Sequence, residues 1–280
     1  RIEETVKETP EQVTVSSVCQ LIQTLHESFQ EEFQIFGLMN LLPKLVSRII
    51  VTDGWDAFRE HAYLYEIYES LSPLVAYFDQ ADQGHLARQA SKAFYDIVEI
   101  KFLPVVRRTI SSAWDVVHDP PQQCVHLMQS LQLVLPETTF TQTVDMLVMP
   151  KLTAAVAAWK PIKTATTLQS KNTGDDGGEK EEEAAAEMHI HTWLHPWLPL
   201  LTTKLSTLYP EIRRKFGAFF STHWTPTAIA DAEFALRCIR PWVGVFDATS
   251  MENLLVRSVV PKLARLLREG LTVHPQNQDI

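Results

Sequence analysis

The chain has 280 residues, of which 45% are apolar and 21% are charged, and it contains only nine glycines. This composition can bury a large core, and the scarcity of glycine and of strand-like alternation favours helices. The formal net charge of −9, without a long row of lysine or arginine, argues against a protein that binds duplex nucleic acid. The longest apolar runs are interrupted by charges or prolines, so we expect no membrane span.

Apolar residues recur at helical spacing along most of the chain. They predict a helix over 13–36, then a helix that holds Pro43 and runs to about residue 51. Further helices are predicted over 56–70, 73–79, 86–117, 121–135, 138–159, 193–208, 210–220, 226–239 and 250–270. In the last of these, the spacing predicts a buried stripe formed by Leu255, Val259, Leu263 and Leu266.

Six of the 16 prolines stand in one apolar frame, with two apolar residues before the proline and others two and six places after it. The frames are Leu41-Leu42-Pro43 with Leu45 and Ile49, Phe102-Leu103-Pro104 with Val106 and Ile110, Val148-Met149-Pro150 with Leu152 and Val156, Trp197-Leu198-Pro199 with Leu201 and Leu205, Leu208-Tyr209-Pro210 with Ile212 and Phe216, and Val259-Val260-Pro261 with Leu263 and Leu267. Because positions −2, +2 and +6 are four residues apart, they lie on one helical face.

Without Pro199, successive framed prolines are 61, 46, 60 and 51 residues apart, which suits units of two or three helices. Trp55, Trp114, Trp159 and Trp224 follow framed prolines by 9 to 14 residues, where a large ring could pack one unit on the next. We therefore predict an all-α fold, an irregular α-helical repeat or superhelical array of antiparallel helices with proline-kinked helices. The alternative is a single irregular bundle whose core helices are opened or kinked by prolines.

The composition changes abruptly near residue 166. Residues 166–187 carry seven acidic residues against two lysines, and they lack the apolar surface that would repay ordering. We therefore predict three parts: an N-terminal helical part over 1–165, an acidic disordered insertion over 166–188, and a C-terminal helical part over 189–280. The chain opens on Arg1 and shows no signal peptide, so we expect it to be a piece of a longer protein.

Three widely spaced cysteines, Cys19, Cys124 and Cys238, each fall in a predicted helix. Such spacing favours reduced core thiols in an intracellular protein over a disulfide or a metal site.

A cluster of three histidines, His189, His191 and His195, is the strongest candidate for chemistry. Three imidazoles within seven residues could hold zinc, but no cysteine or acid with ligand spacing lies nearby. The sequence also lacks a phosphate-binding glycine loop, a nucleophile elbow and a zinc-binding His-Glu helix. We therefore predict a protein that is not an enzyme and that has no cofactor and no metal.

Large aromatic and basic residues of the C-terminal part are the candidate binding residues, because tryptophan and arginine dominate protein interfaces. The candidates are His191, Trp193, His195, Trp197, Arg213, Arg214, Trp224, Trp242 and Lys262. Buried packing is the alternative explanation for the tryptophans.

An ordered set of Trp-Pro motifs from 189 to 276 resembles the C-terminal region of the tuftelin-interacting protein family, the GC-rich-sequence DNA-binding-factor-like domain. The motifs are the run from His191 to Leu200, Leu208-Tyr209 with Ile212-Arg213 and Lys215, His223-Trp224 with Pro226, Pro241-Trp242 with Val245-Phe246, the run from Val260 to Leu263, and the run from His274 to Gln276. Upstream, the run from Val148 to Leu152 with Trp159 fits the same resemblance.

The resemblance implies a nuclear splicing factor that acts in late-stage disassembly of the intron-lariat spliceosome. Members of the family carry a G-patch that stimulates a DEAH-box RNA helicase, but this chain contains no G-patch. For these residues the resemblance therefore implies the anchoring part, a non-catalytic scaffold that binds late spliceosome proteins and a related protein with the same domain. The DNA-binding name fits poorly with a net charge of −9.

Two other hypotheses remain open from the sequence. An RNA-binding helical domain would use Arg107-Arg108 and Arg213-Arg214-Lys215, with an affinity that falls steeply with salt. A metal-dependent hydrolase would use the three histidines.

Overall fold

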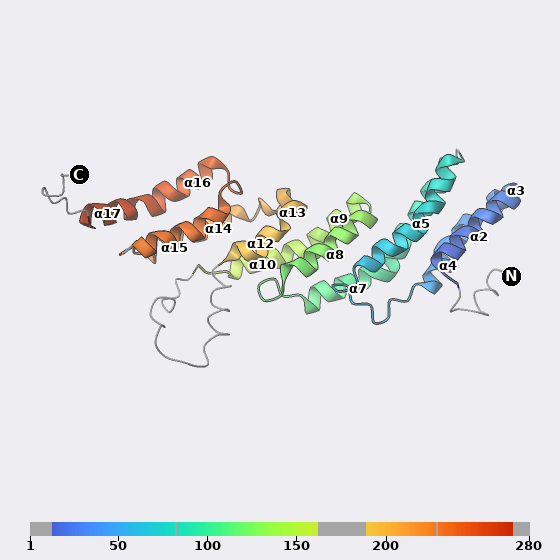
Figure 1. The fold of residues 1–280 in the computed structure, drawn as a ribbon, viewed down its shortest axis with the longest axis horizontal. Coiled ribbons are helices and arrows are strands. Elements are labelled where there is room, and N and C mark those ends of the chain that lie inside the picture. The colour runs from blue at the N-terminus through green and yellow to red at the C-terminus, as the bar shows by residue number, and fades with distance from the viewer. Residues whose placement is uncertain (1–12, 82, 162–188, 228, 271–280) are drawn as a thin grey trace, which may run out of the picture. The chain divides into compact units, whose positions relative to one another are not determined.

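A computed structural model describes residues 13–81, 83–161, 189–227 and 229–270 (Figure 1). Within these ranges every regular element is a helix, and the sole strand-type contact is an isolated bridge between Val243 and Phe246. The predicted all-α fold is therefore confirmed. In the described part, no helix is both long enough and apolar enough to cross a membrane. The acidic insertion predicted over 166–188 lies outside the described residues.

The chain divides into two compact units, the first made of Arg1–Trp114 and Gln122–Val148, the second of Asp115–Pro121 and Met149–Ile280. The described helices of the first unit are α2 (Val15–Ser28), α3 (Gln30–Ile35), η1 (Leu38–Leu41), α4 (Leu42–Ile49), α5 (Ala62–Gln80), α6 (Gly84–Ile97), η2 (Val98–Phe102), α7 (Leu103–Arg108), η3 (Thr109–Ala113), α8 (Pro121–Val134), α9 (Glu137–Thr143) and η4 (Val144–Val148). Those of the second are α10 (Met149–Ala158), α12 (Ile190–Leu194), η6 (His195–Trp197), α13 (Leu198–Leu205), α14 (Tyr209–Thr222), α15 (Ile229–Ile239), η7 (Arg240–Trp242), α16 (Ala248–Leu254), η8 (Leu255–Val259) and α17 (Val260–Gly270).

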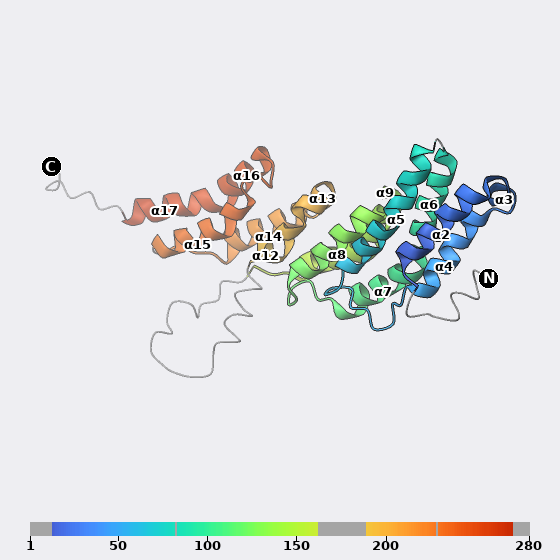
Figure 2. The ribbon, with the colours of Figure 1, turned by 45° about the vertical axis from the view of Figure 1, so that its right-hand side comes forward.

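The core of the first unit lies among α2, α4, α5 and α6, which pack side by side (Figure 2). Each helix contributes one apolar face. In α5, for example, Ile67, Leu71, Leu74 and Phe78 recur every three or four residues and are all buried. The core of the second unit is more aromatic, because Trp197, Trp224 and Trp242 are all at most 1% exposed.

All six framed prolines occupy the same position, the second residue of an α-helix. A proline in the first helical turn removes an N–H that would have no intrahelical partner anyway. Three of these helices, α7, α10 and α17, directly follow a five-residue π-helical turn. In two of them the residue before the proline donates its N–H to the carbonyl five residues back, Leu103 to Val98 and Val260 to Leu255.

The frame also fixes which face is buried. Positions −2, +2 and +6 are buried in the frames of Pro104, Pro150, Pro199 and Pro210. In two cases a predicted tryptophan contacts a residue of a later proline frame. The Trp55 ring meets Phe102 edge-on at 5.0 Å between centroids, and the Trp159 ring meets Phe216 at 5.1 Å. A superhelical arrangement of these units stays a prediction.

Some predicted boundaries are wrong. The helix predicted over 13–36 is broken at Phe29, between α2 and α3, and the helix predicted from residue 56 begins only at Ala62. The break predicted between residue 70 and Pro73 is absent, because α5 runs through Pro73. Proline leaves the carbonyl of Glu69 without its usual donor, and the Ser72 hydroxyl donates to that carbonyl at 3.2 Å. The continuous buried face of α5 then outweighs the local cost of the proline.

The three cysteines are free thiols and are all buried, as predicted. Burial raises the pKa of the Cys19 thiol to about 12 and that of Cys238 to about 11. Both thiols are therefore protonated and unreactive at neutral pH.

Replacing Trp197 with alanine tests the buried aromatic core. The ring is fully buried, so Trp197→Ala should lower the free energy of unfolding by about 3–5 kcal/mol in chemical denaturation. Met146→Ala, at a side chain that is 71% exposed, should change it by less than about 0.5 kcal/mol. Equal effects of the two substitutions would contradict the described core.

Candidate functional site

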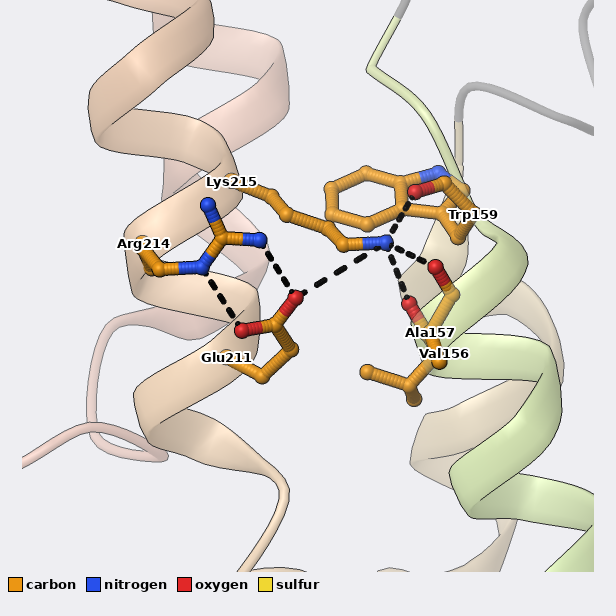
Figure 3. A network of polar contacts seen from close by, with 6 residues as sticks. All are labelled: Val156, Ala157, Trp159, Glu211, Arg214 and Lys215. Carbon is orange, nitrogen blue, oxygen red and sulfur yellow. Dashed lines mark hydrogen bonds and ion pairs between the residues drawn. The ribbon is translucent and has the colours of Figure 1, made fainter.

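The ammonium group of Lys215 closes the C-terminal end of α10 (Figure 3). Its Nζ donates to the carbonyl oxygens of Val156 at 2.8 Å, Ala157 at 2.5 Å and Trp159 at 2.5 Å. The last carbonyls of a helix have no intrahelical donor, and the helix dipole places negative charge there. The lysine ammonium supplies three N–H donors to these carbonyls and a positive charge at the negative end of the dipole. The contact joins residues that are 56 to 59 positions apart in sequence.

A carboxylate and a guanidinium flank this lysine on α14. Arg214 binds Glu211 in a bidentate pair, at 2.8 Å through Nε and 2.7 Å through Nη2, while Lys215 Nζ lies 4.0 Å from the same carboxylate. The hydrogen bond from Arg214 lowers the pKa of Glu211. Burial lowers the pKa of Lys215, and the charge of Glu211 counteracts this shift. The pair is solvent-exposed, so it orients the side chains more than it stabilises the fold.

A cavity of about 660 Å³ opens beside this network. Its lining combines apolar surface with cations, namely Ala157, Trp159, Lys160, Pro161, Glu211, Arg214, Lys215, Ala218, Phe219 and His223. The charged groups at its wall are largely engaged within the protein, since Arg214 is paired with Glu211 and Lys215 is bound to three carbonyls. His223, which lines the cavity, contacts the Thr222 hydroxyl through Nδ1 at 2.6 Å. The mixture of apolar and charged lining is of a kind that a side chain or peptide can contact.

A second lysine contacts a main-chain carbonyl near a helix end in the same way. Lys262 of α17 donates through Nζ to the carbonyl of Trp224 at 2.5 Å, just beyond the C-terminal end of α14. The indole N–H of Trp224 in turn donates to the carbonyl of Asp231 at 3.2 Å. The two contacts share a pattern. Lys215 of α14 binds the carbonyl of Trp159, which follows α10, and Lys262 of α17 binds the carbonyl of Trp224, which lies just after α14.

The predicted His-Trp block forms a line of packed rings. The ring centroids of His189 and His191 are 5.4 Å apart, those of His191 and His195 are 5.6 Å apart, and His195 meets Trp242 edge-on at 4.8 Å. Trp242 then stacks on Phe246 at 4.6 Å. Packing holds this line together, because the indole N–H of Trp242 has no hydrogen-bond partner among the described residues.

Burial keeps the three imidazoles neutral. It is the main cause that lowers the pKa of His189, His195 and His191, the last to about 4, and the neighbouring imidazoles lower that of His191 further. Within the described residues, no group of three His, Cys, Asp or Glu side chains is placed to hold a metal ion. The zinc hypothesis therefore gains no support from the arrangement of these rings.

The structure places the candidate binding residues in two classes. The rings of Trp193, Trp197, Trp224 and Trp242 are at most 2% exposed, so packing accounts for them, as the alternative explanation held. The other five reach the surface at least in part: His191, His195, Arg213 and Lys262 are half-buried, and Arg214 is exposed. All nine belong to the second unit.

The basic cluster at 213–215 is occupied by contacts within the protein. The guanidinium of Arg213 lies 5.3 Å over the Phe246 ring and 3.8 Å from the Asp247 carboxylate, while Arg214 and Lys215 make the contacts described above. Three cations committed in this way are poorly available for phosphate contacts, which weakens the RNA-binding hypothesis at this cluster.

The structural role of Lys215 and the participation of Glu211 were not predicted from the sequence. The spacing of Glu211 three and four residues before Arg214 and Lys215 is a visible sign of an ion-pair cluster on a helix. The carbonyl partners of Lys215 had no such sign, because any helix end presents free carbonyls.

Comparison with known proteins gives a family. The family model described as GC-rich sequence DNA-binding factor-like protein matches residues 15–175 and 178–280. The chain is 26% identical over 271 residues to Tuftelin-interacting protein 11 of Pan troglodytes, Sus scrofa and Homo sapiens, which covers 95% of this chain. The chain spans 28% of the length of these relatives.

Removing the ammonium of Lys215 should destabilise the second unit. Lys215→Met leaves the carbonyls at the end of α10 without their charged donor, so the free energy of unfolding should fall by about 1.5–3 kcal/mol. Lys160→Met, at an exposed lysine of the same cavity, is the matched control and should change it by less than about 0.5 kcal/mol. Urea titration of both variants measures the difference.

The neutral histidines should make stability depend on pH. An unfolded histidine takes up a proton near pH 6.5, whereas folded His191 does so only near pH 4. Between these pH values the unfolded state binds more protons than the folded state. The contribution of His191 to the free energy of unfolding is therefore full above pH 6.5 and is lost as the pH falls toward 4.

Relative to His191→Gln, the wild-type protein should lose at most about 1.4 kcal/mol per pH unit in this range, and solvent screening reduces that figure. Urea denaturation at several pH values measures it. Met146→Ala, at an exposed side chain that does not titrate, is the control and should keep the wild-type profile. Parallel profiles for wild type and His191→Gln would contradict the buried neutral imidazole.

Proposed function

Since the chain belongs to the GC-rich sequence DNA-binding factor-like protein family, we propose that it is a non-catalytic protein-interaction scaffold of a nuclear splicing factor. The scaffold acts in late-stage disassembly of the intron-lariat spliceosome and anchors an activator of a DEAH-box RNA helicase to its partners. The observation that carries this proposal is the similarity to Tuftelin-interacting protein 11 over 95% of the chain. The name of those relatives describes an interaction with another protein, which agrees with a binding role.

The architecture supports a scaffold. Packed helices with apolar faces turned inward leave long outer faces that carry polar residues and exposed apolar ones such as Ile35, Ile100 and Met146, a form suited to broad contacts with other proteins. The half-buried candidates His191, His195, Arg213 and Lys262 and the exposed Arg214 are proposed as protein-binding residues. The four tryptophans shape this surface from beneath.

Helicase activation belongs to a part of the protein other than this chain. The family's G-patch is the segment that stimulates the DEAH-box helicase, and these residues contain none. We propose that this chain holds that segment near its target by binding late spliceosome proteins and a related protein with the same domain. Neither contact requires a membrane or a cofactor.

Affinity purification with this chain from nuclear extract tests the proposal. The wild-type chain should recover late spliceosomal proteins after nuclease treatment, because the contacts are with protein. Trp197→Ala, which removes the buried core ring, should lose them. Recovery of none by the wild type would overturn the scaffold function.

Reversing the charge of two arginines distinguishes the scaffold function from the RNA-binding alternative. The double variant Arg107→Glu with Arg108→Glu should leave recovery of proteins unchanged, whereas an RNA-binding domain would lose an RNA affinity that is sensitive to salt. Electrophoretic mobility shift with single-stranded RNA measures that affinity directly.

A further inference from the structure

One face of α17 carries an apolar stripe that the described residues leave uncovered. Val260 is 49% exposed and Leu267 is 62% exposed, while Leu263 between them is half-buried. Spacings of three and four residues put these three side chains on one face of the helix. Val256, in the preceding turn η8, is 54% exposed. The stripe of Leu255, Val259, Leu263 and Leu266 that the sequence predicts as buried is wrong for three of its four members, because only Val259 is buried.

The other framed helices show that this face is usually covered. At the sixth residue after the framed proline, Ile110, Val156, Leu205 and Phe216 are all at most 2% exposed. Leu267 occupies the same position after Pro261 and is mostly exposed. In four framed helices the apolar residue at this position is therefore buried by its neighbours. In α17 none of the described residues covers it.

The stripe lies in a basic setting. Residues 255–270 contain four basic residues and one acidic residue, a local net charge of +3 on a chain of net charge −9. Arg265 is paired with Glu269 at 2.7 Å, and Lys262 is bound to the Trp224 carbonyl. Arg257 and Arg268 are exposed and make no ion pair with the described residues. Helical spacing puts both at one edge of the stripe.

These charges select among possible occupants. A second copy of the chain would bring the same stripe and the same arginines together, and the like charges would repel across the contact. An amphipathic helix with leucine-type residues on one face and acidic residues beside them would match both the stripe and its cationic edge.

We propose that the stripe formed by Val256, Val260, Leu263 and Leu267, the α17 stripe, is a docking surface for an acidic amphipathic helix of a partner protein. The partner helix packs against α17 in the place that a neighbouring helix takes against the other framed helices. The proposal deepens the proposed function by assigning a surface to the interaction, and it rests on that function only for the identity of the partner.

Two synthetic probes test it. The first is an amphipathic peptide of about 20 residues with leucines on one face and glutamates beside them, long enough to form a helix. The second is the same peptide with lysines in place of the glutamates. Fluorescence anisotropy against the 280-residue chain should show binding of the glutamate peptide, weakened by added salt, and at least about tenfold weaker binding of the lysine peptide.

Three variants locate the contact. Leu267→Glu should lower the affinity for the glutamate peptide by about tenfold or more, because it removes apolar burial and adds repulsion. The double variant Arg257→Glu with Arg268→Glu should reverse the preference between the two peptides. Leu133→Glu, at a leucine that is 65% exposed in the first unit, is the matched control and should bind as the wild type does. Circular dichroism checks that all three remain folded.

Several results would overturn the proposal. These are no binding of the glutamate peptide, equal binding of both peptides, or equal loss in Leu267→Glu and Leu133→Glu. Sedimentation that shows a wild-type dimer abolished by Leu267→Glu would instead assign the stripe to a second copy.

Affinity purification separates this proposal from the proposed function. If Leu267→Glu recovers the same late spliceosomal proteins as the wild type, the scaffold function stands and the α17 stripe is not its docking surface. If the wild type recovers none of them, the scaffold function fails, while the peptide measurements still decide the docking surface.

Discussion

A proline costs a helix nothing at its first turn and costs it a hydrogen bond almost everywhere else. That constraint underlies the arrangement of both units. Each of the six framed prolines is the second residue of an α-helical segment, and in α7, α10 and α17 that segment continues from a π-helical turn. The apolar residues at −2, +2 and +6 lie on one side of the helix, and that side is buried in four of the six frames.

Helix ends impose the second constraint, because their last carbonyls need donors. In the second unit, lysines from later helices supply them, Lys215 for α10 and Lys262 for the residue after α14. This repeated geometry ties α14 to α10, and α17 to Trp224 just after α14, through main-chain carbonyls as well as through side-chain packing. It also withdraws both lysines from the surface, so a basic cluster in the sequence does not become a basic patch for phosphate.

Function follows from what the helices leave uncovered. The aromatic residues that dominate the second unit, such as Trp197 and Trp242, serve its interior. The surface that remains available is made of polar helix faces, of the α17 stripe and of other exposed apolar side chains such as Ile35, Phe36 and Ile100. Which side chains such a surface presents depends on which face of each helix is buried. The position of the framed proline relative to the apolar residues is therefore relevant to the surface as well as to the core.

The sequence predicted the helices and most of their limits well, because periodic apolar residues and prolines act locally. It failed at Pro73, where the buried face of α5 outweighs the local signal for a break. It also assigned the tryptophans as binding candidates, and burial is a property of the packed structure that a residue type alone does not report.

What the sequence by itself determined is the helical class, the common proline frame and the family resemblance, since all three reside in short-range patterns. Only the tertiary structure decided that Lys215 reaches carbonyls 56 to 59 residues away, that the four candidate tryptophans are interior, and that Leu267 is exposed while Phe216 in the same register is buried. The physical reason is that burial and long-range donors depend on which helix lies beside which, and a local pattern of residues does not contain that information.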